Sequence, residues 1–430
     1  MSAPTFMVRV DWNNSGVFGA GDEDVTDRVL SLEWSRGRDY ASQLTGRSRA
    51  GSARIRLDNR SGDYSSFKLT SPIAGSVLPG RGVRIYGNSG SFPYTFPIAL
   101  ANNICWTGWL LRVIPEPSLH GAHAVMLEAI GSLGMVNQRL VELVSQTSRR
   151  TDQLIGDILD AVMWKSSGGG AHLLKTRDLS VGQTTITRHW ADRQGVFDAM
   201  RELEETEAGF LLESKAGAIV FQDRQYRLSG AALTSQLTIS DAATRSYSAI
   251  EQQDPLPAIA NILETEVQLY AVGGLAVLWT LAETGLNSPL ITRAGGTRTF
   301  WASYPNPDSA VDGVAVDAWT TPVVTTDYLV NTAADGSGAN ITADVSVAVE
   351  KFGESMKVTL TNAHASDGYV TFLQARGTPV TASDPVKVRV EDTTSQGKYG
   401  QRMYSNPAKF VPDTQEADDW ARYHLGIYKD

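Results

Sequence analysis

Residues 53–62 read ARIRLDNRSG, in which apolar and polar side chains alternate until turn-forming residues begin at Asp58. Alternation with a period of two residues is typical of a β-strand that buries one face. The same pattern recurs on both sides of this segment, at residues 7–12, 83–86, 109–113 and 124–129. Short strands separated by Gly, Pro and Asn at this spacing indicate a small barrel or sandwich. Residues 1–140 are therefore predicted to form an N-terminal β-barrel.

Beyond residue 150 the apolar residues follow a helical period instead. A first helix is predicted to begin at Thr151, a residue type that often caps helix N-termini. Its buried face would carry Leu154, Ile155, Ile158, Leu159 and Val162. A second helix is predicted to stop at Gly209, because glycine is common just past helix C-termini. Its apolar face would carry Val196, Phe197, Met200 and Leu203.

The second predicted helix also carries a set of carboxylates, namely Glu202, Glu204, Glu205 and Glu207. Charged residues opposite an apolar helical stripe usually face solvent, so a solvated face is expected rather than a metal site. Two apolar runs, at residues 210–213 and 218–221, then flank a short loop that ends in Gly217. This is the pattern of a β-hairpin. Residues 141–234 are thus predicted to be a helix and hairpin module, which makes the fold class mainly β with α+β modules.

Two further regions are predicted nearer the C-terminus. Residues 285–367 are expected to be a β-rich, sandwich-like insert, because alternating segments at 343–349 and 356–360 follow a Gly-containing turn. Asp413 and Glu416 have the spacing of a capping box ahead of an apolar helical pattern. Residues 411–430 are therefore predicted to form a C-terminal helix.

Composition excludes several classes of function. The chain has 430 residues and a formal net charge of −9, without long runs of one sign, which argues against bulk nucleic-acid binding. No stretch approaches the roughly 18 consecutive apolar residues of a membrane span, and the N-terminus lacks the pattern of a signal peptide. The single cysteine, Cys105, lies in an apolar run, so a buried thiol is favoured over a reactive one.

The common catalytic motifs are missing from the sequence. Its six histidines form neither H-E-x-x-H nor a Cys/His cluster, and His120 and His123 lie in a segment better interpreted as a turn. A G-x-S-x-G elbow and a phosphate-binding loop are also absent. We therefore expect no catalytic residues, no metal, no cofactor and no enzymatic activity.

Aromatic residues leave one alternative open. The region 300–330 contains Trp301, Tyr304, Trp319 and Tyr328. Exposed aromatic rings often line carbohydrate sites and protein interfaces, although core packing is the more common role. A carbohydrate-binding protein for host recognition is therefore a second hypothesis, with these four residues as candidate glycan or partner contacts.

Residues 34–86 carry a resemblance to a known family. The run WSRGRDYASQLTGRSRAGSARIRLDNRSGDYSSFKLTSPIAGSVLPGRGVRIY resembles the N-terminal domain of tail-tip (baseplate) hub proteins of long-tailed, siphophage-type bacteriophages. Its features are a strand, an arginine-rich loop, a second strand and a long loop that ends at Pro79, Gly80 and Arg81. We assign these last three residues a structural role, since Pro fixes φ and Gly frees it where the loop rejoins the sheet. Later segments are similar in order to the same family.

The resemblance implies a structural protein of the virion. Hub proteins of this family are trimers whose subunits each contribute two related β-barrels to a ring that meets a sixfold tail tube. Residues 235–284 and 368–410 would form the two parts of the second barrel. The implied partners are other copies of the chain, distal tail ring or tail tube proteins, the tape measure protein and tail fibres or spikes. The implied location is the phage tail tip, after assembly in the host cytoplasm, and a hexameric distal tail ring protein is the closest alternative.

Overall fold

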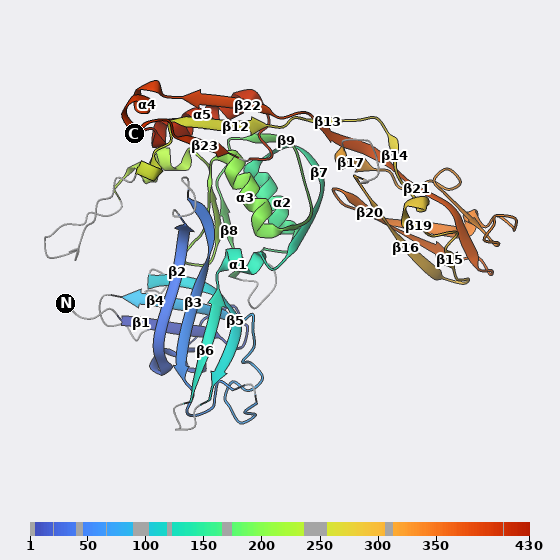
Figure 1. The fold of residues 1–430 in the computed structure, drawn as a ribbon. Coiled ribbons are helices and arrows are strands. Elements are labelled where there is room, and N and C mark those ends of the chain that lie inside the picture. Colours follow the sequence, from blue (N-terminus) through green and yellow to red (C-terminus); the bar gives the residue numbers. More distant parts are fainter. Residues whose placement is uncertain are drawn as a thin grey trace. The chain divides into compact units, whose positions relative to one another are not determined.

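The computed structural model describes residues 5–19, 21–39, 46–65, 67–88, 103–117, 123–165, 174–235, 256–305, 313–406 and 408–430 (Figure 1). Most of its elements are β-strands, with a few α-helices, so the predicted fold class of mainly β with α+β modules is confirmed. The chain divides into two compact units. The first comprises residues 1–140, 151–183 and 195–258, and the second comprises residues 141–150, 184–194 and 259–430.

A curled six-stranded sheet forms the main part of the first unit. In spatial order its strands are β1 (Thr5–Asp11), β4 (Gly82–Asn88), β5 (Ile104–Glu116), β6 (Ala124–Ile130), β3 (Arg47–Asp58) and β2 (Val29–Asp39). Each strand is antiparallel to its neighbours. The end strands β1 and β2 are brought together by Phe6 and Trp34, whose ring centroids lie 5.2 Å apart in an edge-on arrangement. The five segments predicted as strands from period-two alternation thus correspond to β1, β3, β4, β5 and β6.

The concave side of this sheet holds the core of the first unit. Alternate residues such as Val10, Ile55, Leu57 and Val83 are fully buried there. The long segment between β3 and β4 adds to this core, because Tyr64, Ile73 and Val77 belong to the same apolar cluster. Burial of these three side chains explains how a segment of turns follows a defined path across the sheet.

The helix and hairpin module lies in the same unit. Helices α2 (Thr151–Ala161) and α3 (Val196–Glu207) pack on one another, and their predicted apolar residues are buried. Strands β10 (Phe210–Glu213) and β11 (Ile219–Gln222) form the predicted hairpin, and β11 also pairs with β8 (Arg177–Leu179). A short helix, α1 (Ser132–Val136), follows β6. Each predicted element of this module is confirmed.

Two strands of the region 141–234 belong to the second unit instead. They are β7 (Leu140–Arg150) and β9 (Thr185–Gly195), which form a two-stranded sheet. His189 and Trp190 on β9 are buried against Phe410, with ring centroids at 4.8 and 5.5 Å. The module predicted at residues 141–234 thus contains segments of both compact units.

Part of the region proposed as a second barrel forms a small sheet. Strand β12 (Ile262–Val267) lies between β22 (Val386–Glu391), which is antiparallel to it, and β23 (Met403–Asn406), which is parallel. Helix α5 (Thr414–Tyr428) packs on β12 and β22. Its N-cap Asp413 accepts a hydrogen bond from the Glu416 amide, as the capping-box spacing predicts. A short helix, α4 (Thr393–Tyr399), follows β22, and residues 236–255 lie outside the described part of the chain.

The long strand β21 (Gly368–Ala382) organises the predicted insert. It pairs with β13 (Tyr270–Val272), β14 (Ala276–Thr280), β15 (Leu290–Ile291), β17 (Gly313–Trp319) and β18 (Tyr328–Asn331). A three-stranded sheet of β16 (Gly296–Ser303), β20 (Ser355–Asn362) and β19 (Val345–Lys351) shares its core. The sequence boundary at residue 368 falls at the start of β21. This strand pairs with β13 and β14 before the predicted boundary at residue 285 and with β15, β17 and β18 after it, so strand pairing joins three regions that the sequence analysis separates.

Candidate functional site

A buried ion pair connects the curled sheet to the helix and hairpin module within the first unit. The guanidinium of Arg38, on β2, pairs with the carboxylate of Glu204, on α3, and both side chains are less than a tenth exposed. Arg38 also donates to the backbone oxygens of Gly46 at 2.6 Å and Leu211 at 3.2 Å. Glu204 in turn accepts from the Ser48 hydroxyl at 2.9 Å and the Leu211 amide at 2.8 Å. These bonds hold β2, β3, α3 and β10 together.

A second buried carboxylate, Glu213 at the end of β10, lies against two backbone segments that contain glycine. Its oxygens accept from the Gly51 amide at 2.9 Å and the Leu133 amide at 2.6 Å. A Cβ atom on Gly51 or Gly131 would collide with this carboxylate, so the glycines make room for it. Burial raises the pKa of Glu213 to about 7 although the amide donors and Arg36 favour the charged form.

The carboxylates of α3 correct one expectation from the sequence. Glu204 and Glu207 are 4% and 0% exposed, so α3 does not carry a wholly solvated acidic face. Both carboxylates have hydrogen-bond donors from other elements: Glu207 accepts from the Thr151 hydroxyl at 2.8 Å and the Gln183 amide at 3.0 Å. Burial, with the charge of Glu204 beside it, also raises the pKa of Glu205. The helical period could not reveal this, because the arginine and amide donors come from distant segments.

The turn at Pro79, Gly80 and Arg81 is fixed by backbone hydrogen bonds to β5. The Gly80 amide donates to the Leu110 carbonyl at 2.7 Å, and the Leu110 amide donates to the Arg81 carbonyl at 2.8 Å. The φ angle of Gly80 is +81°, a backbone conformation that would be strained for a residue with a Cβ atom. Arg81 also donates through Nε to the Ser76 carbonyl at 3.1 Å.

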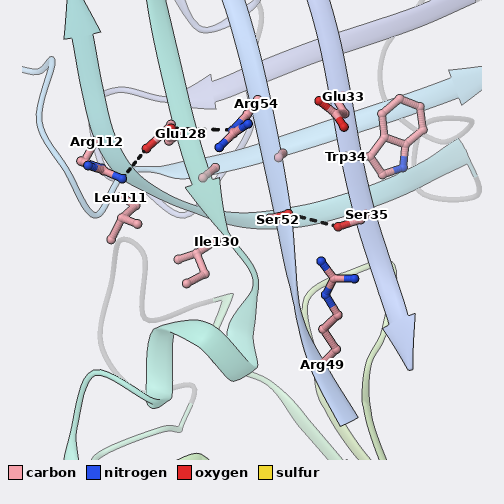
Figure 2. A pocket seen from close by; sticks show the side chains of 12 residues that line it. Glu33, Trp34, Ser35, Arg49, Ser52, Arg54, Leu111, Arg112, Glu128 and Ile130 are labelled. Atoms are coloured by element: carbon pink, nitrogen blue, oxygen red, sulfur yellow. Dashed lines mark hydrogen bonds and ion pairs between the residues drawn. The ribbon is translucent and has the colours of Figure 1, made fainter. Parts of the chain in front are cut away.

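The outer face of the curled sheet carries a row of alternating charges (Figure 2). Register places Glu33, Arg54, Glu128 and Arg112 beside one another on four neighbouring strands. Glu128 is shared by Arg112 at 2.8 Å and Arg54 at 3.7 Å. The row lines a depression of about 450 Å³. Both signs of charge within one depression suit a polar protein surface better than a polyanion.

The four aromatic residues proposed as contacts have different environments. Tyr304, Trp319 and Tyr328 are at most 4% exposed and belong to the core of the insert, so they are not available to an external ligand. Trp319 donates to the Phe352 carbonyl and Tyr328 to the Val345 carbonyl. Trp301 differs, because 43% of it is exposed. Around Trp301 the residues of β16 alternate between buried and exposed positions. The alternation can be recognised in the sequence, but the sequence alone does not say which of the two faces is buried.

The described residues offer no obvious centre for metal chemistry. Within the described ranges, His, Cys, Asp and Glu side chains do not gather in a group of three or more that could hold a metal ion. Cys105 is half-buried and packs against the core of the curled sheet. None of the described helices has the length and apolar character needed to cross a membrane. The predicted turn around His120 lies outside the described residues.

Comparison with known proteins gives only remote similarities. The sequence matches no family model and no curated protein. Among solved structures, the 43 kDa tail protein of prophage MuSo2 from Shewanella oneidensis aligns with 50% of this chain at 9% identity and a TM-score of 0.31, and the chain spans about half (53%) of that protein. A tail protein from Neisseria meningitidis aligns over 83% of this chain and 97% of its own, at 9% identity and a TM-score of 0.35.

A third similar structure comes from a secretion system. It is an E. coli protein described as a component of the type VI secretion system with structural similarity to T4 bacteriophage tail proteins. It aligns over 78% of this chain and 73% of its own, at 11% identity and a TM-score of 0.30. TM-scores of this size do not establish a common fold.

Proposed function

We propose that the chain is a structural subunit of a bacteriophage tail, a hub protein that closes the distal end of the tail tube. The proposal rests on residues 34–86, whose sequence resembles the N-terminal domain of siphophage tail-tip hubs. Their structure has a strand, a return strand, a long loop packed on the core and a corner at Gly80, as the resemblance implies, whereas the arginine-rich segment expected as a loop, residues 36–38, lies within strand β2. The corner bonds to Leu110 place this loop at a defined position on the sheet.

In this proposal the protein works by assembly and has no catalytic activity. Three copies would form a homotrimer, in which the curled sheet of residues 1–140 alternates with a second barrel around a closed symmetry axis. The sheet of β12, β22 and β23 would belong to that second barrel. Many small contacts acting together would then give a stable ring.

The proposed partners are the neighbours of a hub in the tail. They are distal tail ring or tail tube proteins, the tape measure protein, and tail fibres or spikes. The protein would be a component of the virion at the tail tip, assembled in the host cytoplasm. The outer face with Glu33, Arg54, Glu128 and Arg112 is a suitable surface for one of these protein contacts, because its charges of both signs favour a specific register.

The test is a cryo-microscopy reconstruction of the tail tip of particles that contain this chain, without imposed symmetry. The expected density has three copies, each with two barrel-like domains, at the end of the tube. Six copies with one such domain each would favour a hexameric distal tail ring protein instead. Particles in which antibodies against the chain never label the tail tip would contradict both assignments.

A further inference from the structure

The sheet of β16, β20 and β19 (Figure 1) buries alternate residues in the insert's core, so one of its faces packs on that core and the other does not. Phe300, Met356 and Leu360 point into the core. The intervening residues therefore line the opposite face, because successive side chains of a strand alternate. They are Thr297, Thr299 and Trp301 on β16, Lys357, Thr359 and Thr361 on β20, and Ser346, Ala348 and Glu350 on β19.

Short hydroxyl side chains occupy most of this outer face. Register aligns Thr297 with Thr361 and then Ser346 across the three strands. Thr299 is aligned with Thr359, and their hydroxyl oxygens lie 3.2 Å apart. A hydroxyl both donates and accepts hydrogen bonds, so such rows present both functions on a flat, rigid surface. Sugar hydroxyl groups have the same dual character.

Trp301 gives the face an aromatic platform at one end. Its ring stacks nearly parallel to that of Phe352, with centroids 5.9 Å apart and planes at 18°, which holds its orientation. The Trp301 side chain is nevertheless 43% exposed. The guanidinium of Arg193 and the ammonium of Lys357 lie over this ring, 5.1 and 6.0 Å from its centroid, so a ligand would contact the part of the indole that they leave exposed.

The charges beside the platform are compensated within the protein. Lys357 pairs with Glu350 at 2.6 Å, and Arg193 pairs with Glu142 at 3.3 Å. A charged ligand would have to compete with these pairs, whereas an uncharged ligand would not. The CH groups along one side of a pyranose ring suit the exposed part of the Trp301 indole, and the sugar hydroxyls suit the threonine rows.

We propose that this face, with Trp301 and the hydroxyls of Thr299 and Thr359, is a binding site for an uncharged oligosaccharide. The rigid sheet and the stacked indole limit the ordering cost of binding. The site is independent of the trimer and of the role in closing the tail tube. It would let the chain make a reversible contact with a polysaccharide surface.

The experiment measures binding of the purified full-length chain to soluble maltohexaose, cellohexaose, chitohexaose and mannohexaose by titration calorimetry, with polygalacturonate as the charged comparison. Binding of at least one neutral hexasaccharide is expected. Trp301→Ala should weaken it by about tenfold or more. Thr299→Val, which keeps the shape of the side chain and removes its hydroxyl, should weaken it by a smaller factor.

Tyr226→Ala is the matched control, because Tyr226 is 46% exposed but lies in the first unit. Its affinity should equal that of the parent. Melting curves of all variants separate loss of binding from loss of folding, and Thr299→Val keeps the test valid should Trp301→Ala unfold. Failure of all four neutral sugars to bind at millimolar concentration, binding of polygalacturonate alone, or unchanged affinity in both site variants would each overturn the proposal. None of these results bears on the tail-tip location, which the reconstruction tests separately.

Discussion

Gly80 shows how a single backbone conformation can limit the residue type. Its φ of +81° lies in the left-handed region, which L-residues with a Cβ adopt only at a cost. A Cβ at this position would meet no atom within 4 Å, so the cost of substitution comes from the backbone and not from crowding. Because the Gly80 amide is bonded to Leu110, the backbone is not free to relax into another region.

Gly80→Val is therefore expected to lower the free energy of unfolding by about 1–2 kcal/mol or more and to reduce soluble yield. The measurement is a denaturant titration of the purified variant. Gly156→Ala serves as the control, because Gly156 lies inside α2 and a Cβ atom there would be 3.9 Å from the Leu179 side chain, so alanine should stabilise the helix by about 1 kcal/mol. A Gly80→Val protein with the parent's stability would show that this turn does not have the structural role assigned to it.

Glu213 makes stability depend on pH in a direction unlike that of most carboxylates. Burial raises its pKa from the usual 4.5 to about 7, so the folded state binds this proton more tightly than the unfolded state does. The stabilising contribution of the protonated form is complete below pH 4.5. This contribution is lost as pH rises from about 4.5 to about 7, and its loss lowers the free energy of unfolding by about 3 kcal/mol.

Glu213→Gln mimics the protonated acid and should flatten this part of the pH profile. Near pH 5 the variant should have a stability close to that of the parent, and near pH 8 it should be the more stable of the two. Urea unfolding at a series of pH values between 4.5 and 8 measures this. Parallel profiles for parent and variant would show that Glu213 does not titrate in this range.

At the scale of elements, Arg38 connects four segments of the first unit by one side chain. Its buried pair with Glu204 joins β2 to α3, while its bond to the Leu211 carbonyl adds β10 and its bond to Gly46 adds the segment before β3. Taking two charges out of water is costly, so the pair stabilises the fold only while both partners are present. Removal of one partner leaves an uncompensated buried charge.

Arg38→Met is thus expected to destabilise the protein by about 3–5 kcal/mol. The double variant Arg38→Met/Glu204→Gln should recover part of this loss, because the isolated charge is removed. Arg56→Met is the control: its pair with Glu116 is about 44% and 34% exposed and should contribute at most about 1 kcal/mol. If Arg38→Met and Arg56→Met had equal effects in thermal unfolding, the buried pair would not be the connection described here.

At the scale of the whole molecule, net charge opposes the association that the proposed hub requires. Each copy carries a formal charge of −9, which keeps the free subunit soluble and makes copies repel one another. Salt screens this repulsion over about 10 Å at 0.1 M ionic strength. Assembly would therefore need either screening or a tube end that gathers several copies.

The fraction of trimer is expected to increase with ionic strength at constant protein concentration. Sedimentation equilibrium in low and high concentrations of NaCl measures it, with sucrose as the uncharged comparison. Dissociation of a trimer by added salt would contradict this expectation and would show instead that ion pairs between copies hold the interface.

Much of the local structure could be predicted from residue order because its causes are local. Period-two alternation located β3 and β6, helical periodicity located the buried faces of α2 and α3, and the spacing of Asp413 and Glu416 located the start of α5. Each of these signals comes from residues within a few positions of one another. The same is true of Gly80, where the residue type itself indicates an unusual φ.

Tertiary structure decided the features whose partners are far apart in the chain. Glu204 is buried because Arg38 and Ser48, more than 150 positions away, satisfy it, so its helix alone predicted a solvated face. Strand β21 joins segments on both sides of the expected boundary at residue 285, because backbone pairing depends on which strand edges meet. The sequence by itself therefore determined the type and position of most elements. The fold decided which charges are buried, and it left Trp301 exposed while Tyr304, Trp319 and Tyr328 are in the core, because inward and outward faces exist only once sheets pack.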